Sequence, residues 1–279
     1  MNSIVNMDKI HFYKMQGAGN DFILIENTSG IFHGRETSFF RNLCLRHTGI
    51  GADGVMLLEN SESAEFTLKY FNSDGLPAEM CGNGARCAVY LANYLSLAPQ
   101  KCSFQIGPEI YKAEVIPGKS VRLQMQLPKI LRTPNETKSF LSDDFKQGMS
   151  LNTGVPHLVI ETRKPLDDLD VVSLGRHYRY HEKFKPSGTN VNFVYPEKPN
   201  HLLARVYERG VEAETLACGS GAVACAVFAN QVYGWSSPIF VHFSGGILRI
   251  EFETGYKKIF LFGPVELVFE GDFERANFQ

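Results

Sequence analysis

The sequence predicts an α+β fold made of two pseudo-symmetric lobes, in each of which a curved, mostly antiparallel sheet wraps around a central buried helix. Two observations predict it. Segment 81–93 recurs at 218–230 without a gap and with six identities, so the chain contains one unit twice. Each copy opens an apolar helical stretch, while most of the remaining chain consists of short alternating segments typical of strands.

The repeat also predicts where the lobes lie. We expect residues 1–130 to form an N-terminal lobe carrying Cys81, completed by the C-terminal tail 268–279, and residues 131–267 to form a C-terminal lobe carrying Cys218. A length of 279 residues agrees with about two domains. The polar run 132–148 is the predicted crossing between the halves.

Alternation and turn residues predict the elements of the first half. Loop 16–21 contains two glycines but lacks the third glycine of a dinucleotide-binding fingerprint, which argues against such a site. Helix 85–92 is apolar nearly all round and should be buried. The other predicted elements are strands at 10–15, 22–25, 55–58, 66–71, 102–106, 110–116 and 121–127, and a helix at 36–47.

The second half repeats this order. Its buried helix is predicted at 222–229, again apolar nearly all round. The other predicted elements are strands at 190–195, 201–207, 239–243, 248–252 and 258–262, and a helix at 166–182. His157, near the start of this half, is expected in a glycine-flanked loop.

Composition excludes several classes of function. A net charge of −2, with basic residues spread along the chain, predicts neither nucleic-acid nor membrane binding. The N-terminus lacks the apolar core of a signal peptide, so we expect a cytoplasmic protein whose six cysteines stay reduced. Cysteine spacing does not match a zinc site, and Cys87 and Cys225 fall inside the apolar helices as core residues.

Cys81 and Cys218, the first residues of the two repeat copies, are the candidate reactive groups. Each precedes a glycine turn and a helix N-terminus, where unpaired N–H groups favour anions and lower the pKa of a thiol. Facing each other across a ligand, one thiolate could remove a proton from a carbon while the other thiol supplies one. A redox dithiol is the competing interpretation, but redox cysteines usually lie close together, whereas these lie 137 positions apart.

Several polar residues near these turns allow two interpretations each. Glu208 and Arg209 could meet an amine and a carboxylate of one substrate, or form an ordinary surface pair. Asn72 could donate to a carboxylate or simply form a turn. His157 could assist catalysis or be structural.

Three motifs together carry a specific resemblance. Segments 14–22 (KMQGAGNDF), 72–75 with 81–87 (NSDG and CGNGARC), and 206–210 with 217–222 (VYERG and ACGSGA) resemble diaminopimelate epimerase, and the resemblance covers essentially the whole chain. It implies an isomerase without cofactor or metal that interconverts LL- and meso-diaminopimelate for lysine and peptidoglycan synthesis. The substrate would be a small amino acid, and a homodimer is the expected assembly.

The resemblance also implies the site residues. Cys81 and Cys218 match the catalytic pair, Glu208 the acidic residue near the reacting amine, and His157 a residue that supports catalysis. The residues matching substrate contacts are Asn20, Asn72, Gly82, Asn83, Asn190, Glu208, Arg209, Gly219 and Ser220.

The sequence departs from the family at two positions, and it is compatible with three other functions. Gly54 stands where many family members have Gln, and Val155 where many have Asn, so selectivity for the far end of the substrate could be relaxed. The alternatives are an enzyme of the proline racemase or hydroxyproline epimerase type, a redox-sensing relative, and a pyridoxal phosphate enzyme. A cyclic imino acid has no distal group to occupy Glu208, Arg209 and Asn72, which argues against the first.

Overall fold

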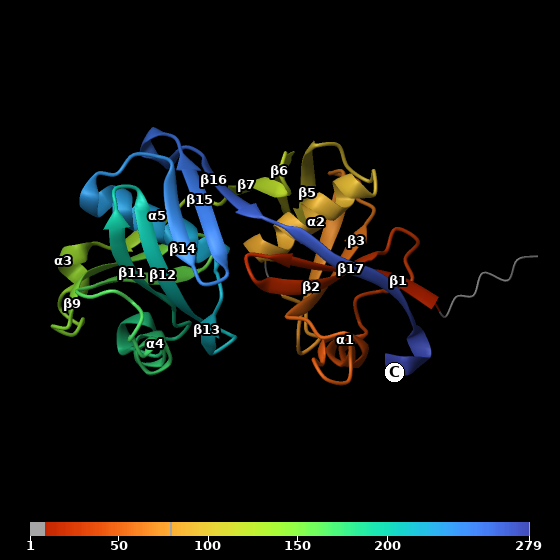
Figure 1. Ribbon diagram of the computed structural model, residues 1–279, viewed down its shortest axis with the longest axis horizontal. Helices are drawn as coiled ribbons and strands as arrows, with labels where there is room; N and C mark the ends of the chain where they lie inside the picture. The colour runs from red at the N-terminus through yellow and green to blue at the C-terminus, as the bar shows by residue number, and fades with distance from the viewer. Residues whose placement is uncertain (1–8, 79, 279) are drawn as a thin grey trace, which may run out of the picture. The chain divides into compact units, whose positions relative to one another are not determined.

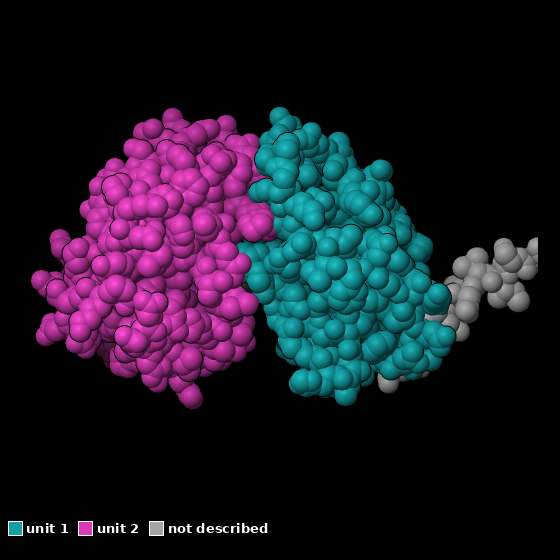
Figure 2. All heavy atoms as spheres, viewed as in Figure 1, with its two compact units in different colours: residues 1–121, 265–279 teal, residues 122–264 magenta. Residues whose placement is uncertain are grey.

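The computed structural model describes residues 9–78 and 80–278, which form two compact units. Unit 1 comprises residues 1–121 and 265–279, and unit 2 comprises residues 122–264 (Figure 2). Within the described ranges, none of the helices has the length and apolarity required to cross a membrane.

Unit 1 contains a mixed sheet with a helix against each face (Figure 1). Its order is β17-β1-β2-β3-β4-β5-β6, in which β2–β3 and β4–β5 are parallel and the other pairs are antiparallel. The elements are β1 (Lys9–Gly17), β2 (Asn20–Glu26), α1 (Thr37–Cys44), β3 (Gly54–Glu59), β4 (Phe66–Asn72), α2 (Gly82–Tyr94), β5 (Lys101–Ile106), β6 (Glu109–Ile116), β17 (Glu266–Glu274) and the 3₁₀-helix η3 (Arg275–Phe278).

Unit 2 repeats this pairing scheme. Its order is β8-β9-β10-β11-β12-β14-β15-β16, with β10–β11 and β12–β14 parallel, and β7 pairs with β16. The elements are β7 (Ser120–Met125, entering from unit 1), β8 (Lys129–Arg132), α3 (Pro134–Thr137), β9 (Phe145–Asn152), β10 (Pro156–Thr162), α4 (Val171–Arg179), η1 (Glu182–Phe184), β11 (Asn190–Lys198), β12 (His201–Glu208), β13 (Ala213–Thr215), α5 (Gly219–Tyr233), β14 (Ile239–Phe243), β15 (Gly246–Phe252), η2 (Thr254–Tyr256) and β16 (Ile259–Pro264).

Each parallel pair is joined by a segment that contains a helix, because parallel neighbours require a crossover connection. Helix α1 links β2 to β3, α2 links β4 to β5, α4 links β10 to β11, and α5 links β12 to β14. These crossovers explain why the otherwise antiparallel sheets are mixed, and they place α2 and α5 next to the strands that lead into the two cysteine turns.

The two inner helices are enclosed by their sheets. Helix α5 packs against β9, β10, β11, β12, β14, β15 and β16, and α2 packs against β1, β2, β3, β4 and β6. A single helix can touch so many strands only where the sheet curves around it. The apolar sequences of both helices supply this core, and the α+β class predicted from them is confirmed.

Alternation along the central strands separates two cores in each unit. On β2, Ile23 and Ile25 pack in the cluster containing α1, while Phe22 lies beside the α2 glycine Gly84. On β10, Leu158 and Ile160 pack in the cluster containing α4 residues, which leaves His157 and Val159 on the opposite face. The strands are buried on both faces and therefore read as continuous apolar runs.

Three segments differ from what the sequence indicates. His157, expected in a glycine-flanked loop, lies in β10, which a turn at residues 153–155 separates from β9. The predicted crossing 132–148 contains α3, where Thr133 and Glu136 form a capping box, and the start of β9. Strand β17 is largely exposed and has little alternation, so pairing with β1 rather than its own pattern defines it.

Candidate active site

Cys81 and Cys218 occupy the same structural position in their helices. Each is the N-cap residue with extended backbone, at φ −107° and ψ 116° for Cys81 and φ −127° and ψ 118° for Cys218. Their carbonyl oxygens accept hydrogen bonds of 2.8 Å from the N–H groups of Ala85 and Ala222. The first N–H groups of a helix have no carbonyl partner within that helix, so each thiol lies beside donors suited to an anion.

In unit 1, Asn20 connects the Cys81 turn to the start of β2. Its Oδ1 lies 3.7 Å from the Cys81 Sγ and accepts a hydrogen bond of 3.5 Å from the Asn83 side chain. Its Nδ2 donates to the Asp53 carboxylate. The carboxylate fixes the orientation of the amide, so the Asn20 oxygen is presented to Cys81 and Asn83.

Charged side chains hold the loop that carries Asn20. Arg46 donates two hydrogen bonds to Asp21, of 3.1 Å and 2.8 Å, and lies 2.6 Å from Asp53, while the Lys14 ammonium lies 2.6 Å from Asp21. Burial opposes ionisation of Asp21, but its bonds with Arg46 and Lys14 outweigh that effect and lower its pKa. The carboxylate is therefore charged at neutral pH and keeps the network closed.

Arg86 places a buried cation in the first turns of α2. Its side chain is fully buried, and Nη1 donates hydrogen bonds of 3.1 Å to the Gly82 carbonyl and to the Asn83 Oδ1. Among the described residues, its Nε and Nη2 have no hydrogen-bond partner. Burial lowers the pKa of Arg86 to about 10, and the charges of Cys87 and Cys81 partly oppose this shift. The side chain therefore remains a cation at neutral pH.

The second copy of the turn has no such cation. The residue aligned with Arg86 is Val223, which is fully buried in α5. The two cysteine turns therefore share their backbone geometry but differ in their electrostatic surroundings.

In unit 2, a chain of polar contacts leads from Asn192 to Cys218. The Asn192 amide lies 3.0 Å from the His157 Nδ1, the His157 Nε2 lies 3.0 Å from the Ser220 hydroxyl, and that hydroxyl lies 3.5 Å from the Cys218 Sγ. Asn192 Nδ2 also donates to the Leu158 carbonyl at 3.3 Å, which identifies it as the donor. His157 thus accepts at Nδ1 and carries its proton on Nε2.

His157 is neutral in this setting. Complete burial, with the nearby charge of Arg209, lowers the pKa of its imidazole from 6.5 to about 3. It donates to Ser220, leaving the Ser220 proton free to point at the Cys218 sulfur. In unit 2 His157 acts on the thiol through Ser220, and is in that respect a positioning residue.

Glu208 raises the pKa of Cys218, whereas Ser220 lowers it. Burial and then the Glu208 carboxylate raise the pKa of the Cys218 thiol well above 9.0, although Ser220 and the Gly221 N–H favour the thiolate. The Thr215 hydroxyl donates to Glu208 and fixes the carboxylate at the end of β12. Cys218 is consequently a thiol at neutral pH.

Asn190 and Arg209 form a separate link beside this chain. The Asn190 Oδ1 accepts from the Arg209 N–H at 2.8 Å, and its Nδ2 donates to the Pro156 carbonyl at 3.0 Å. Asn190 pairs with His157 in the β10–β11 register. Asn72, exposed at the end of β4, closes a turn through backbone hydrogen bonds of 3.0 Å to Leu76 and 2.8 Å from Gly75.

Each unit therefore gathers part of the expected site. Unit 1 brings Cys81, Gly82, Asn83 and Asn20 together, and unit 2 brings Cys218, Gly219, Ser220, His157 and Glu208 together. Sequence reasoning missed the supporting residues Asp53, Arg86, Asn192 and Thr215. A signal existed for two of them, because Arg86 is the only charge in the apolar stretch 85–92 and Asn192 shares strand periodicity with Asn190.

The departure at Gly54 has a packing reason. A Cβ on Gly54 would lie 2.4 Å from the Phe71 carbonyl oxygen and 2.5 Å from the Tyr70 ring. The Tyr70 ring fills the space beside this strand, so a glutamine could enter only with movement of the β4 backbone.

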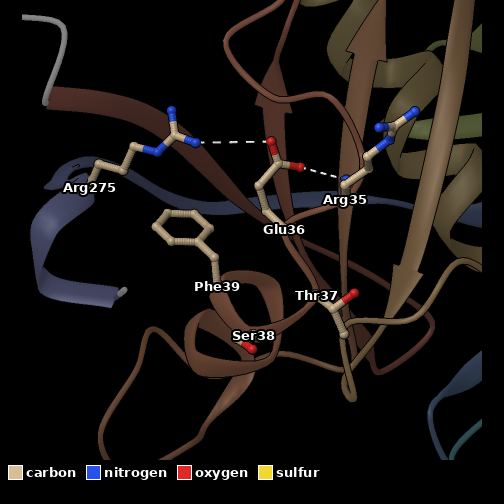
Figure 3. Close-up of a pocket in the computed structure, with 6 residues that line it drawn as sticks. All are labelled: Arg35, Glu36, Thr37, Ser38, Phe39 and Arg275. Atoms are coloured by element: carbon tan, nitrogen blue, oxygen red, sulfur yellow. Dashed lines mark hydrogen bonds and ion pairs between the residues drawn. The ribbon is translucent and has the colours of Figure 1, made fainter.

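An open pocket elsewhere in unit 1 contains none of these residues. It lies at the start of α1 and is lined by Arg35, Glu36, Thr37, Ser38, Phe39 and Arg275 (Figure 3). Glu36 accepts from the Arg35 N–H at 2.7 Å and lies 3.9 Å from the Arg275 guanidinium. The pocket's acidic and basic groups already face one another, and we assign it no function.

Known proteins match the chain over nearly its whole length. The diaminopimelate epimerase family pattern matches residues 12–125 and 149–268. A diaminopimelate epimerase from Aquifex aeolicus is 42% identical over 275 residues, covering 94% of this chain and 97% of that protein. One from Chlorobaculum tepidum is 41% identical over 269 residues, covering 92% and 98%.

Solved structures share the fold at much lower sequence identity. A Bacillus anthracis phenazine biosynthesis protein of the PhzF family has a TM-score of 0.72 at 12% identity, covering 95% of this chain and 99% of that one. A hydroxyproline epimerase from Agrobacterium vitis has a TM-score of 0.65 at 12% identity, covering 96% and 93%. These likenesses concern the fold alone. The sequence relatives decide the family: this chain belongs to the diaminopimelate epimerases.

Proposed function

We propose that this chain inverts one α-carbon of LL-2,6-diaminopimelate to give meso-2,6-diaminopimelate, using Cys81 and Cys218 as its acid–base pair and no cofactor. The observation that carries the proposal is the matched pair of N-cap thiols, in a chain that is 42% identical to a diaminopimelate epimerase. The reaction would supply lysine and peptidoglycan precursors.

The chemistry requires one proton to leave and another to arrive at the same carbon. A thiolate takes the α-proton, the electron pair of the broken C–H bond delocalises into the carboxylate, and the opposite thiol donates its proton to the other face. The backbone N–H groups at the N-termini of α2 and α5 would stabilise the charge that develops on the carboxylate. The pair ends with its thiol and thiolate roles exchanged, so the reverse reaction uses the same groups.

We infer that Cys218 is the resting thiol and that Cys81 is the thiol that ionises more easily. The buried Arg86 cation belongs to the Cys81 turn, whereas the Glu208 carboxylate raises the pKa of Cys218. The Asn20 oxygen accepts from the Cys81 thiol, so Cys81 gives up this contact when it acts as the base.

The polar residues around the turns are proposed to hold the substrate. Asn20, Asn83 and Ser220 contact or adjoin the thiols, and Glu208 is suited to an ammonium group. Asn190 and Arg209 are already joined through the Arg209 N–H, and with Asn72 they are proposed to bind the distal amino acid group. His157 would act by positioning Ser220.

Incubation with LL-diaminopimelate in D₂O tests the proposal directly. We expect meso product with deuterium at one α-carbon and without added cofactor, and no turnover by Cys81→Ser or Cys218→Ser despite retained substrate binding. Inversion without deuterium, or activity in either serine variant, would refute the two-thiol mechanism. Proline as the preferred substrate would instead favour the proline racemase type.

The free cysteines and strand β17 bear on the cellular setting and the assembly of the chain. We propose a cytoplasmic enzyme whose six free cysteines match a reducing compartment. We also propose a homodimer, since β17 carries the exposed side chains of Val268 and Phe269, which suit self-association. Light scattering of the chain and of Phe269→Lys tests the dimer, which the lysine should dissociate.

A further inference from the structure

A cluster of two histidines and a glutamate lies on the sheet of unit 2, away from the cysteine turn. Glu197, His201 and His242 each offer a ligand atom, and these atoms lie within 4.8 Å of one another. His201 opens β12, whereas Glu208 ends it. At roughly 3.3 Å per residue, the two are about 23 Å apart along the strand.

Strand register brings the three side chains to one face. In the parallel β12–β14 pair, His201 lies opposite Phe240 and Leu203 opposite His242, so the two histidines are diagonal neighbours. Their in-between neighbours Leu202 and Val241 are fully buried on the other face. On β11 the register shifts between Pro196 and Lys198, which makes Glu197 the extra residue of a bulge. Bulges commonly re-aim a side chain in this way.

The histidine rings are held in position before any ligand binds. The His201 Nδ1 lies 2.8 Å from the His242 Nε2, and the His201 ring stacks on Phe240 with centroids 4.8 Å apart. The adjoining turn is fixed by the Asn200 side chain, which donates to the carbonyls of Ser236 and Pro238 at 2.9 Å and 3.0 Å.

The donor set suits a divalent transition metal. His201 and His242 supply two imidazole nitrogens, and Glu197 supplies a carboxylate oxygen. Nearby Lys198 opposes a cation, whereas the Glu197 carboxylate supports one. Two histidines and a carboxylate match zinc sites that keep a fourth position open.

The apo geometry is close to that of a metal site but not identical with it. A distance of 2.8 Å between the two nitrogens is that of a hydrogen bond with one proton between the rings. On a tetrahedral zinc ion with bonds of about 2.05 Å, the two nitrogens would be roughly 3.3 Å apart. The rings need to separate by only about 0.5 Å, with the proton moving to the outer nitrogen of one ring.

We propose that Glu197, His201 and His242 form a binding site for a divalent transition metal ion, with Zn²⁺ as the best match and water in the fourth position. The site is separate from the proposed catalytic groups and does not depend on their assignment.

Calorimetry with ZnCl₂ tests the site in the full chain carrying Cys81→Ser and Cys218→Ser, which removes the two thiols of the cysteine turns; the other four cysteines are buried. We expect one equivalent to bind. Adding His242→Ala should weaken binding by at least about tenfold, since even outer-shell losses typically cost 10–100-fold. His33→Ala, which changes an exposed histidine of unit 1, is the matched control and should leave binding unchanged. Absence of binding in the chain that lacks Cys81 and Cys218, or a smaller effect of His242→Ala, would overturn the proposal.

A second measurement guards against misfolding of the variant. Imidazole nitrogen resonances of the chain with intact histidines should report Zn²⁺ at both His201 Nδ1 and His242 Nε2, with the other histidines unaffected. Shifts confined to other histidines would also overturn the site. With Cys81 and Cys218 present, His242→Ala should have the same epimerase activity as the unsubstituted chain.

Discussion

The imidazole of His157 lies 3.0 Å from the hydroxyl of Ser220, and this contact makes Ser220 a donor toward Cys218. The histidine carries its proton on the nitrogen facing Ser220, because Asn192 donates to the other nitrogen. A serine that accepts from His157 has its own proton available for the sulfur 3.5 Å away. His157 and Ser220, which lie far apart in the sequence, thus together direct a hydroxyl proton toward the Cys218 sulfur.

Ser220→Ala should slow turnover without unfolding the chain. A hydrogen bond to a charged group contributes about 1.5–3 kcal/mol, so loss of the Ser220 bond to the Cys218 thiolate should lower kcat/KM by roughly 10–150-fold. Both reaction directions should fall equally, because the equilibrium between substrate and product is unchanged. Initial rates from each isomer measure this, with Ser139→Ala on the surface as the control. Unchanged kcat/KM would contradict the role given to Ser220.

His157 should make the chain less stable in acid. Its pKa is lowered from 6.5 to about 3 in the folded state, so below pH 6.5 the unfolded chain binds a proton that the folded chain does not. This group therefore favours unfolding by about 1.4 kcal/mol for each pH unit that the pH falls between 6.5 and about 3. Urea unfolding at several pH values should show a shallower slope for His157→Gln than for the parent chain. The exposed His33→Gln should keep the parent slope; equal slopes in all three would exclude the effect.

Arg86→Met should reduce the reactivity of Cys81. The substitution keeps much of the side-chain volume but removes the buried cation, so the thiolate loses a favourable charge. We expect iodoacetamide labelling of Cys81 at neutral pH to slow roughly tenfold, equivalent to about 1.4 kcal/mol. Peptide mapping distinguishes Cys81 from Cys218. Arg86→Lys, which retains the charge, should recover part of the rate, and failure of both variants to change labelling would exclude electrostatic support by Arg86.

Glu208→Gln should have the opposite effect on the other thiol. Removing the carboxylate removes a cause of the raised pKa of Cys218, so its labelling should begin at lower pH. Epimerase activity should nevertheless fall, because the acidic partner for the substrate amine is lost. Glu214→Gln on β13, which breaks an ion pair with Arg205, is the matched control. A Cys218 labelling profile identical in Glu208→Gln and the parent chain would disprove the coupling.

The chain should accept a wider range of amino acids than a relative that carries polar side chains at positions 54 and 155. Gly54 and Val155 offer no side-chain hydrogen bond, and a missing bond to a charged group costs about 1.5–3 kcal/mol. We expect slow α-proton exchange of glutamate or lysine in D₂O, well below the rate with diaminopimelate. Complete inactivity on both amino acids would show that the remaining contacts suffice for strict selectivity.

The elements that the sequence predicted best are those with long apolar or alternating runs. Helices 85–92 and 222–229 lie inside α2 and α5, and strand 66–71 lies inside β4, because burial of a regular face leaves a regular pattern. The turn at residues 153–155 left no such pattern, and β8 and β17 expose most of their residues. Their pairing comes from neighbours distant in the chain, which no local signal records.

By itself, the sequence determined the duplicated unit, the α+β class and the two thiols at glycine turns, because each is a local pattern of residue types. Only the tertiary structure decided which charged groups surround each of the two thiols. Arg86 is buried beside one, whereas Glu208 and the Asn192–His157–Ser220 chain surround the other. Charge–thiol coupling depends on distance and burial, and both arise only when β10, β11 and β12 pack around α5.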